Sequence, residues 1–324
     1  MTTTRALCLG LLLGVVACKK QEAKVEPQTS GTAAAPAAKA VPFPLVEQRA
    51  RLKTQVFAPT DPAPAPKPPT DVFELVRYRA PLGQNAAYVS VTKKQARGPA
   101  IVWIAGGMDW GIGDSAWAPA PRSNDQSARA FREQGIVLML PALRGSSGNP
   151  GKNECFLGEV DDVLAAAEYL ASRPDVDPQR IYLGGHSTGA TMALLVAASS
   201  ARFRAVFAFG PVADPRHYGE GGCLPANISD DELAPRVPLL SVGDIRTPTL
   251  IIEGADGNGD SIDLLRSRLR GAPVKIHILP GGDHFNVLAP GTEMLARQML
   301  ADAGPAPRIE LDTAALSKQL AAGD

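Results

Sequence analysis

The chain has 324 residues, of which 45% are hydrophobic, 20% are charged and 5% are aromatic. These fractions are typical of a folded globular protein, and they exclude a chain that is disordered throughout. Basic and acidic side chains number 33 each, so the formal net charge is zero. We therefore expect no nucleic-acid partner, because proteins of that class carry an excess of lysine and arginine.

The first 17 residues have the pattern of an export signal. Arg5 provides a positive start, and the apolar stretch over residues 6–17 is too short to span a bilayer. The stretch ends in the letters VVAC, with Cys18 last, which resembles the lipobox of bacterial lipoproteins. We predict a signal peptide over residues 1–17, lipidation of Cys18, and an exported protein held at the bacterial cell envelope by its lipid alone. An ordinary secretory signal with an incidental cysteine is the alternative.

The two ends of the mature chain are predicted to lie outside the folded domain. Residues 18–70 are rich in alanine and proline, and proline lacks the amide donor that regular structure needs. Such a stretch buries too little apolar area to offset its ordering entropy. We predict a tether here, with a helical turn or more within residues 46–57, and a C-terminal tail over residues 304–324.

Strands and helices alternate between these ends, over residues 71–303. Apolar runs bounded by turn residues predict strands, and apolar residues at helical spacing predict helices. The predicted strands are residues 73–78, 87–91, 100–105, 135–140, 180–184, 205–209, 249–253 and 274–279. The predicted helices are residues 157–172, 188–199, 262–269 and 293–301. This order predicts an α/β fold with a mostly parallel, doubly wound sheet. Residues 211–246, rich in glycine, proline and aspartate, are predicted to form a small lid between two of the last core strands and are called the lid segment below.

A nucleophile is predicted at Ser187. The letters GHSTG over residues 185–189 match G-x-S-x-G, between a predicted strand and a predicted helix, which is the context this motif requires. Small residues at both ends allow a tight turn and close packing of the helix on the strand. The helix N-terminus adds partial positive charge where negative charge would develop. A chance pentapeptide is the alternative.

A general base is predicted at His284, in the loop after the last predicted strand. A base that follows the nucleophile in the chain fits the order Ser, acid, His of hydrolases built on this motif. His186 lies inside the motif, His217 lies in the lid segment and could contact substrate, and His277 lies in mid-strand.

The acid that would orient His284 has several candidates. The loop after residues 249–253 contains Asp256, which we predict to be the acid because it lies nearest the end of the strand. Asp260 is the second choice, and it could instead cap the following helix. Asp214 and Glu253 also stay open.

Two backbone amides are needed to stabilise an oxyanion. One is predicted at Thr188 and the other at Gly106 or Gly107, after the strand over residues 100–105. The same loop contains Trp110 and Trp117, which with His186 are candidates for the substrate pocket. Ordinary packing is the alternative for both tryptophans.

Cys155 and Cys223 are the cysteines that remain once the signal is removed and Cys18 is lipidated. An exported protein permits disulfides, and both residues follow strands predicted to end at the same sheet edge. A Cys155–Cys223 disulfide is therefore a candidate, with two buried thiols as the alternative. No further soft ligands cluster with them in the sequence, so no metal site is predicted.

These motifs together resemble the α/β-hydrolase superfamily over residues 71–303. The letters RGSSG at 144–148 and GHSTG at 185–189 look most like the catalytic domains of prolyl oligopeptidase and acylaminoacyl-peptidase relatives. Those proteins usually have His-Gly-x-x-Asp in the acid loop, where this chain has EGAD at 253–256. They also have an N-terminal β-propeller, for which residues 19–70 are too short and too rich in proline.

The resemblance implies a serine hydrolase that acts on a small-molecule ester or a peptide through an acyl-enzyme, without metal or organic cofactor. Strict peptidase function is not implied, because the propeller is what restricts the substrates of those peptidases. A catalytically silent binding or scaffold lipoprotein on the same fold is the alternative, because fold alone does not determine function.

Overall fold

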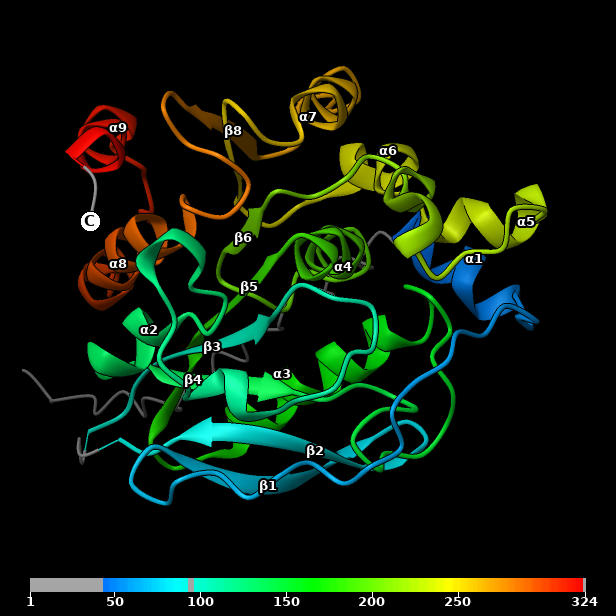
Figure 1. Cartoon of the computed structure of the whole chain (residues 1–324), viewed down its shortest axis with the longest axis horizontal. Helices are drawn as coiled ribbons and strands as arrows, with labels where there is room; N and C mark the ends of the chain where they lie inside the picture. The colour runs from blue at the N-terminus through cyan, green and yellow to red at the C-terminus, as the bar shows by residue number, and fades with distance from the viewer. Residues whose placement is uncertain (1–42, 93–95, 323–324) are drawn as a thin grey trace, which may run out of the picture. The chain divides into compact units, whose positions relative to one another are not determined.

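Eight strands form one sheet in the order β1-β2-β4-β3-β5-β6-β7-β8 (Figure 1). The structure is a computed structural model that describes residues 43–92 and 96–322. The strands β1 and β2 are antiparallel to their neighbours at one edge, and the six others run parallel. The strands are β1 (Phe73–Ala80), β2 (Gly83–Ser90), β3 (Gly98–Ile104), β4 (Val137–Pro141), β5 (Val176–His186), β6 (Val206–Phe209), β7 (Thr249–Gly254) and β8 (Val274–Leu279). Each strand predicted from the sequence is present, and the predicted mostly parallel α/β sheet is confirmed.

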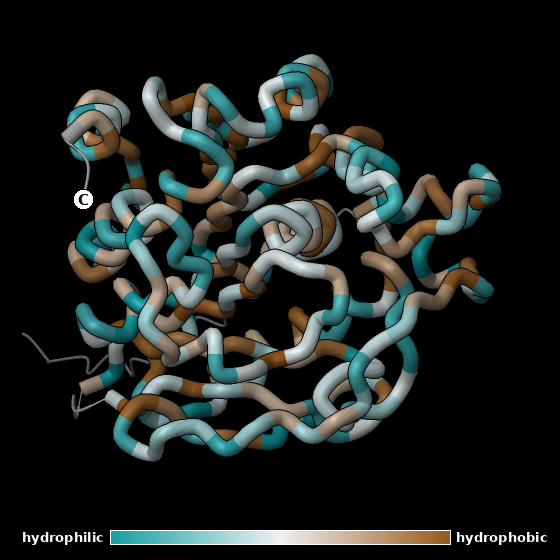
Figure 2. Tube along the Cα trace, viewed as in Figure 1, coloured by the Kyte–Doolittle hydropathy of each residue, from teal (hydrophilic) through white to brown (hydrophobic). Residues whose placement is uncertain are grey.

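Helices cover both faces of this sheet. One face packs on α3 (Glu159–Ser172), α4 (Thr188–Ala197) and α7 (Gly259–Arg266). The other face packs on α2 (Arg129–Glu133), α8 (Leu288–Ala301) and α9 (Thr313–Ala322). Successive β3 residues alternate between the two cores, as the pleat of a strand buried on both faces requires. The apolar residues accordingly gather along the central strands (Figure 2).

The packed unit is larger than the predicted domain of residues 71–303 at its N-terminal side. Residues 43–70 include the helix α1 (Pro44–Arg51), and the backbone of Ala58 pairs with Asn153. Leu45 is 2% exposed and Val56 is 8% exposed, so both side chains belong to the core. The predicted tether is therefore wrong for this part, because a few well-placed apolar residues pack on the domain despite the surrounding prolines. Residues 1–42, including the predicted signal and Cys18, lie outside the described residues.

The predicted C-terminal tail is also part of the packed unit. Ile309, Leu311 and Leu316 are buried in the core that α8 shares with the sheet, and α9 contacts β8. Three apolar side chains in a short polar stretch give too weak a periodicity to predict this packing.

The lid segment leaves the sheet between β6 and β7, as predicted, and it is tied down on the domain. It contains two short helices, α5 (Asp230–Leu233) and α6 (Pro238–Ser241). Arg236, fully buried, donates hydrogen bonds to the backbone oxygens of Glu154 and Cys155 and to the hydroxyl of Thr54. One guanidinium thus joins the lid segment, the N-terminal segment and the loop before α3.

A buried carboxylate at the start of α3 predicts a pH effect on stability. Glu159 is 0% exposed, and its Oε2 atom has no hydrogen-bond partner among the described residues. Burial raises the pKa of Glu159 from 4.5 to about 7. The folded state therefore favours the protonated acid, and this stability is present below pH 4.5 and lost as the pH rises to about 7. The loss corresponds to roughly 3 kcal/mol in the free energy of unfolding.

Urea unfolding of the wild type and Glu159→Gln at pH 5 and pH 8 tests this effect. The glutamine cannot ionise, so the variant is expected to be the more stable protein at pH 8 and to lose less stability between the two pH values. Glu133→Gln, at a side chain that is 54% exposed, is the matched control and should follow the wild type. Equal free energies of unfolding for wild type and Glu159→Gln at pH 8 would contradict the prediction.

Candidate active site

Ser187 lies at the sharp turn between β5 and α4, where the motif places it. Its backbone has φ 53° and ψ −113°, a strained conformation for a residue with a side chain. A Cβ on Gly189 would lie 2.0 Å from the carbonyl oxygen of Ile104, and one on Gly185 would lie 2.5 Å from the backbone of Gly189. The two glycines therefore allow the helix to start directly against the sheet, with Ser187 at the turn.

The turn at Ser187 is joined to the end of the neighbouring strand β6. The Ser187 amide donates to the oxygen of Phe209 at 2.8 Å. The next residue, Gly210, has φ +64°, and a Cβ there would lie 2.4 Å from Cε1 of His284. Glycine at 210 thus leaves the space that the His284 imidazole occupies, next to the residue that holds the Ser187 backbone.

Glu253 is the carboxylate that contacts His284. Its Oε2 atom lies 3.1 Å from Nδ1 of His284, and the side chain is fully buried whereas that of His284 is 19% exposed. The carboxylate also accepts the backbone amides of Gly254 at 2.9 Å and Asn258 at 3.1 Å. A Cβ on Gly257 would lie 2.3 Å from Oε1, so the loop after β7 wraps closely around this carboxylate.

The predicted acid, Asp256, is wrong as the partner of His284. Asp256 is exposed, and so is Asp260, which lies in the first turn of α7. Asp214 caps the 3₁₀ turn Pro215–Gly221 and forms an ion pair with Arg216 at 2.6 Å. The strand β7 ends at the sheet edge just after Glu253, so Asp256, three residues further along the chain, lies outside the sheet and is exposed to solvent.

A sequence signal for Glu253 did exist. It is the one charged residue in the apolar strand β7, and a charge buried in a core strand requires a partner.

The glycine pair after β3 lies against the turn at Ser187. A Cβ on Gly106 would lie 3.4 Å from Cβ of Ser187, so the Gly106 backbone is next to the serine side chain. Gly107 has φ +118°, and its carbonyl oxygen accepts a hydrogen bond from the Thr188 hydroxyl. The structure therefore brings together the three predicted sources of backbone amides, Thr188 next to Ser187 in the chain and Gly106 and Gly107 from the loop after β3.

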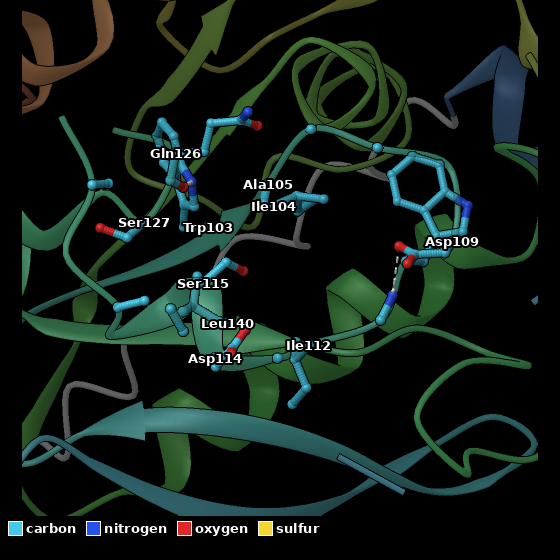
Figure 3. A pocket seen from close by; sticks show the side chains of 18 of the residues that line it. Trp103, Ile104, Ala105, Asp109, Ile112, Asp114, Ser115, Gln126, Ser127 and Leu140 are labelled. Atoms are coloured by element: carbon cyan, nitrogen blue, oxygen red, sulfur yellow. Dashed lines mark hydrogen bonds between the residues drawn. The ribbon is translucent and has the colours of Figure 1, made fainter. Parts of the chain in front are cut away.

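A cavity of about 470 Å³ opens beside this glycine pair (Figure 3). Its wall comes from the loop after β3 and the end of β4, and it includes Gly106, Gly107 and the predicted pocket residue Trp110. Asp109 and Asp114 belong to the lining, and none of the described residues that line the cavity is a lysine or an arginine. The cavity is thus an acidic compartment next to the Ser187 turn.

The other two candidates for the pocket lie elsewhere. The Trp117 ring is partly buried and packs edge-on against Tyr88, with 5.1 Å between ring centroids, so it covers the edge of the core. His186 is 1% exposed, and its Nε2 atom lies 2.9 Å from the backbone oxygen of His284. Burial and the neighbouring His284 lower the pKa of His186 to about 4, so it is neutral at pH 7. His186 therefore supports the backbone of the His284 loop from inside the protein and does not face a substrate.

Cys155 and Cys223 are adjacent and unbonded in the structure. The thiol of Cys155 donates to the backbone oxygen of Cys223 at 2.8 Å, across a sequence separation of 68 residues. The contact joins the loop before α3 to the lid segment. The two cysteines are therefore close in space, as the sequence predicted.

We expect these thiols to form a disulfide in an oxidising compartment. Mass spectrometry of the unreduced, denatured protein should find the peptides of Cys155 and Cys223 linked, and Cys223→Ser should abolish the linked peptide. A bridge over a loop of this length contributes up to roughly 4 kcal/mol to stability if it is unstrained, so reduction should lower the midpoint of unfolding. Recovery of both cysteines as alkylated free thiols after aerobic purification would contradict the prediction.

The comparisons with known proteins agree with this geometry. Residues 122–227, which include Ser187 but neither Glu253 nor His284, match the model of the prolyl oligopeptidase family. The uncharacterized peptidase YtmA of Bacillus subtilis is 32% identical over 157 residues, which cover 43% of this chain and 60% of that protein.

Two solved structures show the fold. A Mycobacterium tuberculosis puromycin-hydrolyzing peptidase has a TM-score of 0.56 and 20% identity, covering 74% of this chain and 41% of its own. A Pyrococcus horikoshii acylaminoacyl peptidase has a TM-score of 0.58 and 16% identity. The match covers 76% of this chain and 44% of the peptidase. The predicted resemblance is thus confirmed for the α/β-hydrolase fold and for the matched region. The chain spans less than two thirds of the length of each of these proteins.

Proposed function

We propose that this chain is a serine hydrolase that cleaves an ester or amide bond through an acyl-enzyme. The observation that carries the proposal is the arrangement at the end of β6. Phe209 accepts the Ser187 amide, and the next residue, Gly210, leaves the space for the His284 ring that Glu253 contacts. A nucleophile on a strained turn, a histidine and a buried carboxylate are the three groups that such catalysis needs.

The proposed mechanism follows from the hydrogen bond between Glu253 and Nδ1 of His284. Glu253 holds Nδ1 of His284, so Nε2 is the nitrogen that takes the proton of Ser187 as its Oγ attacks the substrate carbonyl. Glu253 stabilises the imidazolium that forms. His284 then returns the proton to the leaving group, and water activated by the same histidine releases the acyl group.

The oxyanion would be bound by backbone amides at Thr188 and at the Gly106–Gly107 pair. The substrate group on one side of the scissile bond would enter the adjacent cavity. The carboxylates of Asp109 and Asp114 in its lining disfavour an anionic substrate group there. The relatives described as peptidases support an amide substrate. The small size of the cavity, about 470 Å³, supports one of a few residues at most.

Labelling with a fluorophosphonate probe, followed by a substrate screen, tests the proposed function. We expect the probe to label Ser187, and neutral p-nitrophenyl esters or aminoacyl-anilides to be hydrolysed faster than carboxylate-bearing analogues. A folded protein that is neither labelled nor active on any member of either series would instead support a silent binding or scaffold protein.

We propose further that the protein is exported and held at the cell envelope by a lipid on Cys18. Support comes from the sequence VVAC that ends a short apolar stretch. No helix within residues 43–92 and 96–322 is long and apolar enough to cross a membrane. The site would then act outside the cytoplasm.

Phase partitioning in a detergent tests the lipid anchor. The wild type, expressed with its full N-terminus, should enter the detergent phase, and Cys18→Ser should stay in the aqueous phase. The matched control is Cys8→Ser, which changes a cysteine within the predicted signal and should partition like the wild type. A wild type that stays in the aqueous phase would refute the anchor.

A further inference from the structure

We propose that Tyr218 is a positioning residue for the nucleophile, whose hydroxyl donates a hydrogen bond to Oγ of Ser187 and holds that atom in place for attack. This inference rests on the proposed function of Ser187. Tyr218 lies in the 3₁₀ turn Pro215–Gly221 of the lid segment, 31 residues beyond the serine in the chain. No sequence motif connects the two residues, and only the fold brings them together.

The ring of Tyr218 is held in a defined orientation. It stacks on Phe156, with 6.2 Å between ring centroids and 7° between ring planes. Phe156 is fully buried and lies edge-on to Trp110, with 5.2 Å between centroids. Because two aromatic rings support it, the Tyr218 hydroxyl reaches the active site at a fixed point.

That hydroxyl contacts two residues one helical turn apart. It lies 2.8 Å from Oγ1 of Thr191, and the Ser187 side chain is its other polar neighbour. Thr191 lies in the first turn of α4, four residues after Ser187, and its amide donates to the Ser187 oxygen at 2.9 Å. One phenol therefore connects the nucleophile to the first turn of its own helix.

The direction of these hydrogen bonds follows from the burial of Thr191. Its Oγ1 atom accepts the Val212 amide at 3.0 Å, and the side chain is 0% exposed. A buried hydroxyl also donates its proton, and the Tyr218 oxygen is the acceptor found for it among the described residues. Thr191 then donates to Tyr218, and Tyr218 donates to Ser187.

The phenol remains a donor across the working pH range of the enzyme. Burial raises the pKa of Tyr218 well above its usual range, so the group keeps its proton. A proton on the phenol makes it complementary to the serine oxygen as that oxygen becomes more negative during proton transfer to His284. No bond to Tyr218 forms or breaks, and the tyrosine acts only through Ser187.

Tyr218→Phe tests the proposal, because phenylalanine keeps the ring and its stacking and removes only the hydroxyl. We expect kcat for a p-nitrophenyl ester to fall about tenfold, which corresponds to about 1.4 kcal/mol. The rate of fluorophosphonate labelling should fall by a similar factor, with KM and Tm close to the wild-type values. Tyr169→Phe, a partly buried tyrosine on α3, is the matched control and should leave all four quantities unchanged.

A pair of Thr191 variants tests the direction of the hydrogen bonds. Thr191→Ser keeps the hydroxyl and should retain the wild-type labelling rate, whereas Thr191→Val should reproduce the loss seen in Tyr218→Phe. Equal labelling rates for the two Thr191 variants, or an unchanged kcat in Tyr218→Phe, would overturn the proposal. Failure of the proposed function is a separate outcome, since the wild type itself would then not be labelled at Ser187.

Discussion

Ser187→Ala is expected to lower kcat by about 10⁶, because it removes the only atom that forms the covalent intermediate. The remaining amides and His284 cannot form an acyl-enzyme. Turnover of the best p-nitrophenyl ester from the screen measures the effect, and loss of fluorophosphonate labelling reports the same change independently.

The fold should survive this substitution. The backbone of residue 187 keeps its bonds, since its amide donates to Phe209 and its oxygen accepts the Thr191 amide at 2.9 Å. Alanine keeps the Cβ atom, so Tm should stay near the wild-type value. The matched control is Ser172→Ala, at an exposed serine that ends α3, and it should be fully active. More than a few per cent of wild-type turnover in Ser187→Ala would show that another residue is the nucleophile.

Glu253→Gln is expected to lower kcat by about 10⁴. The glutamine preserves the size of the side chain, but it is neutral and cannot stabilise the imidazolium of His284. It also presents an amide in a site where three donors converge on one carboxylate, namely His284, Gly254 and Asn258. The wrong tautomer of His284 is then favoured, with the proton on Nε2, the nitrogen that is proposed to take the proton of Ser187.

The neighbouring acids supply the controls. Asp256→Asn and Asp260→Asn change exposed carboxylates of the same loop and should retain near-normal kcat. Asp214→Asn removes the ion pair with Arg216 and should act mainly on the stability of the lid segment. A collapse of kcat in Asp256→Asn beside an active Glu253→Gln would show that the contact seen here is not the functional one.

The sequence alone predicted the strands, the main helices and the position of Ser187, and the reason is that these depend on local patterns. A strand buried on both faces, such as β3, needs an unbroken apolar run. The turn at Ser187 needs small residues at 185 and 189, since a Cβ at either position would collide with backbone. Constraints of this kind act over a few neighbouring residues and can be read directly from the chain.

Only the tertiary structure decided which carboxylate contacts His284, where the packed unit begins and ends, and what touches Ser187. Glu253 and Asp256 are three residues apart, and the end of β7 determines that one is buried against His284 while the other faces solvent. Leu45 and Leu316 lie in short segments without a long apolar run, and they become core because a distant surface covers them. Tyr218 reaches Thr191, four residues after Ser187, because the lid segment folds back over α4. Each of these depends on contacts between residues far apart in the chain, whose pairing is determined when the whole core packs and leaves little trace in local sequence.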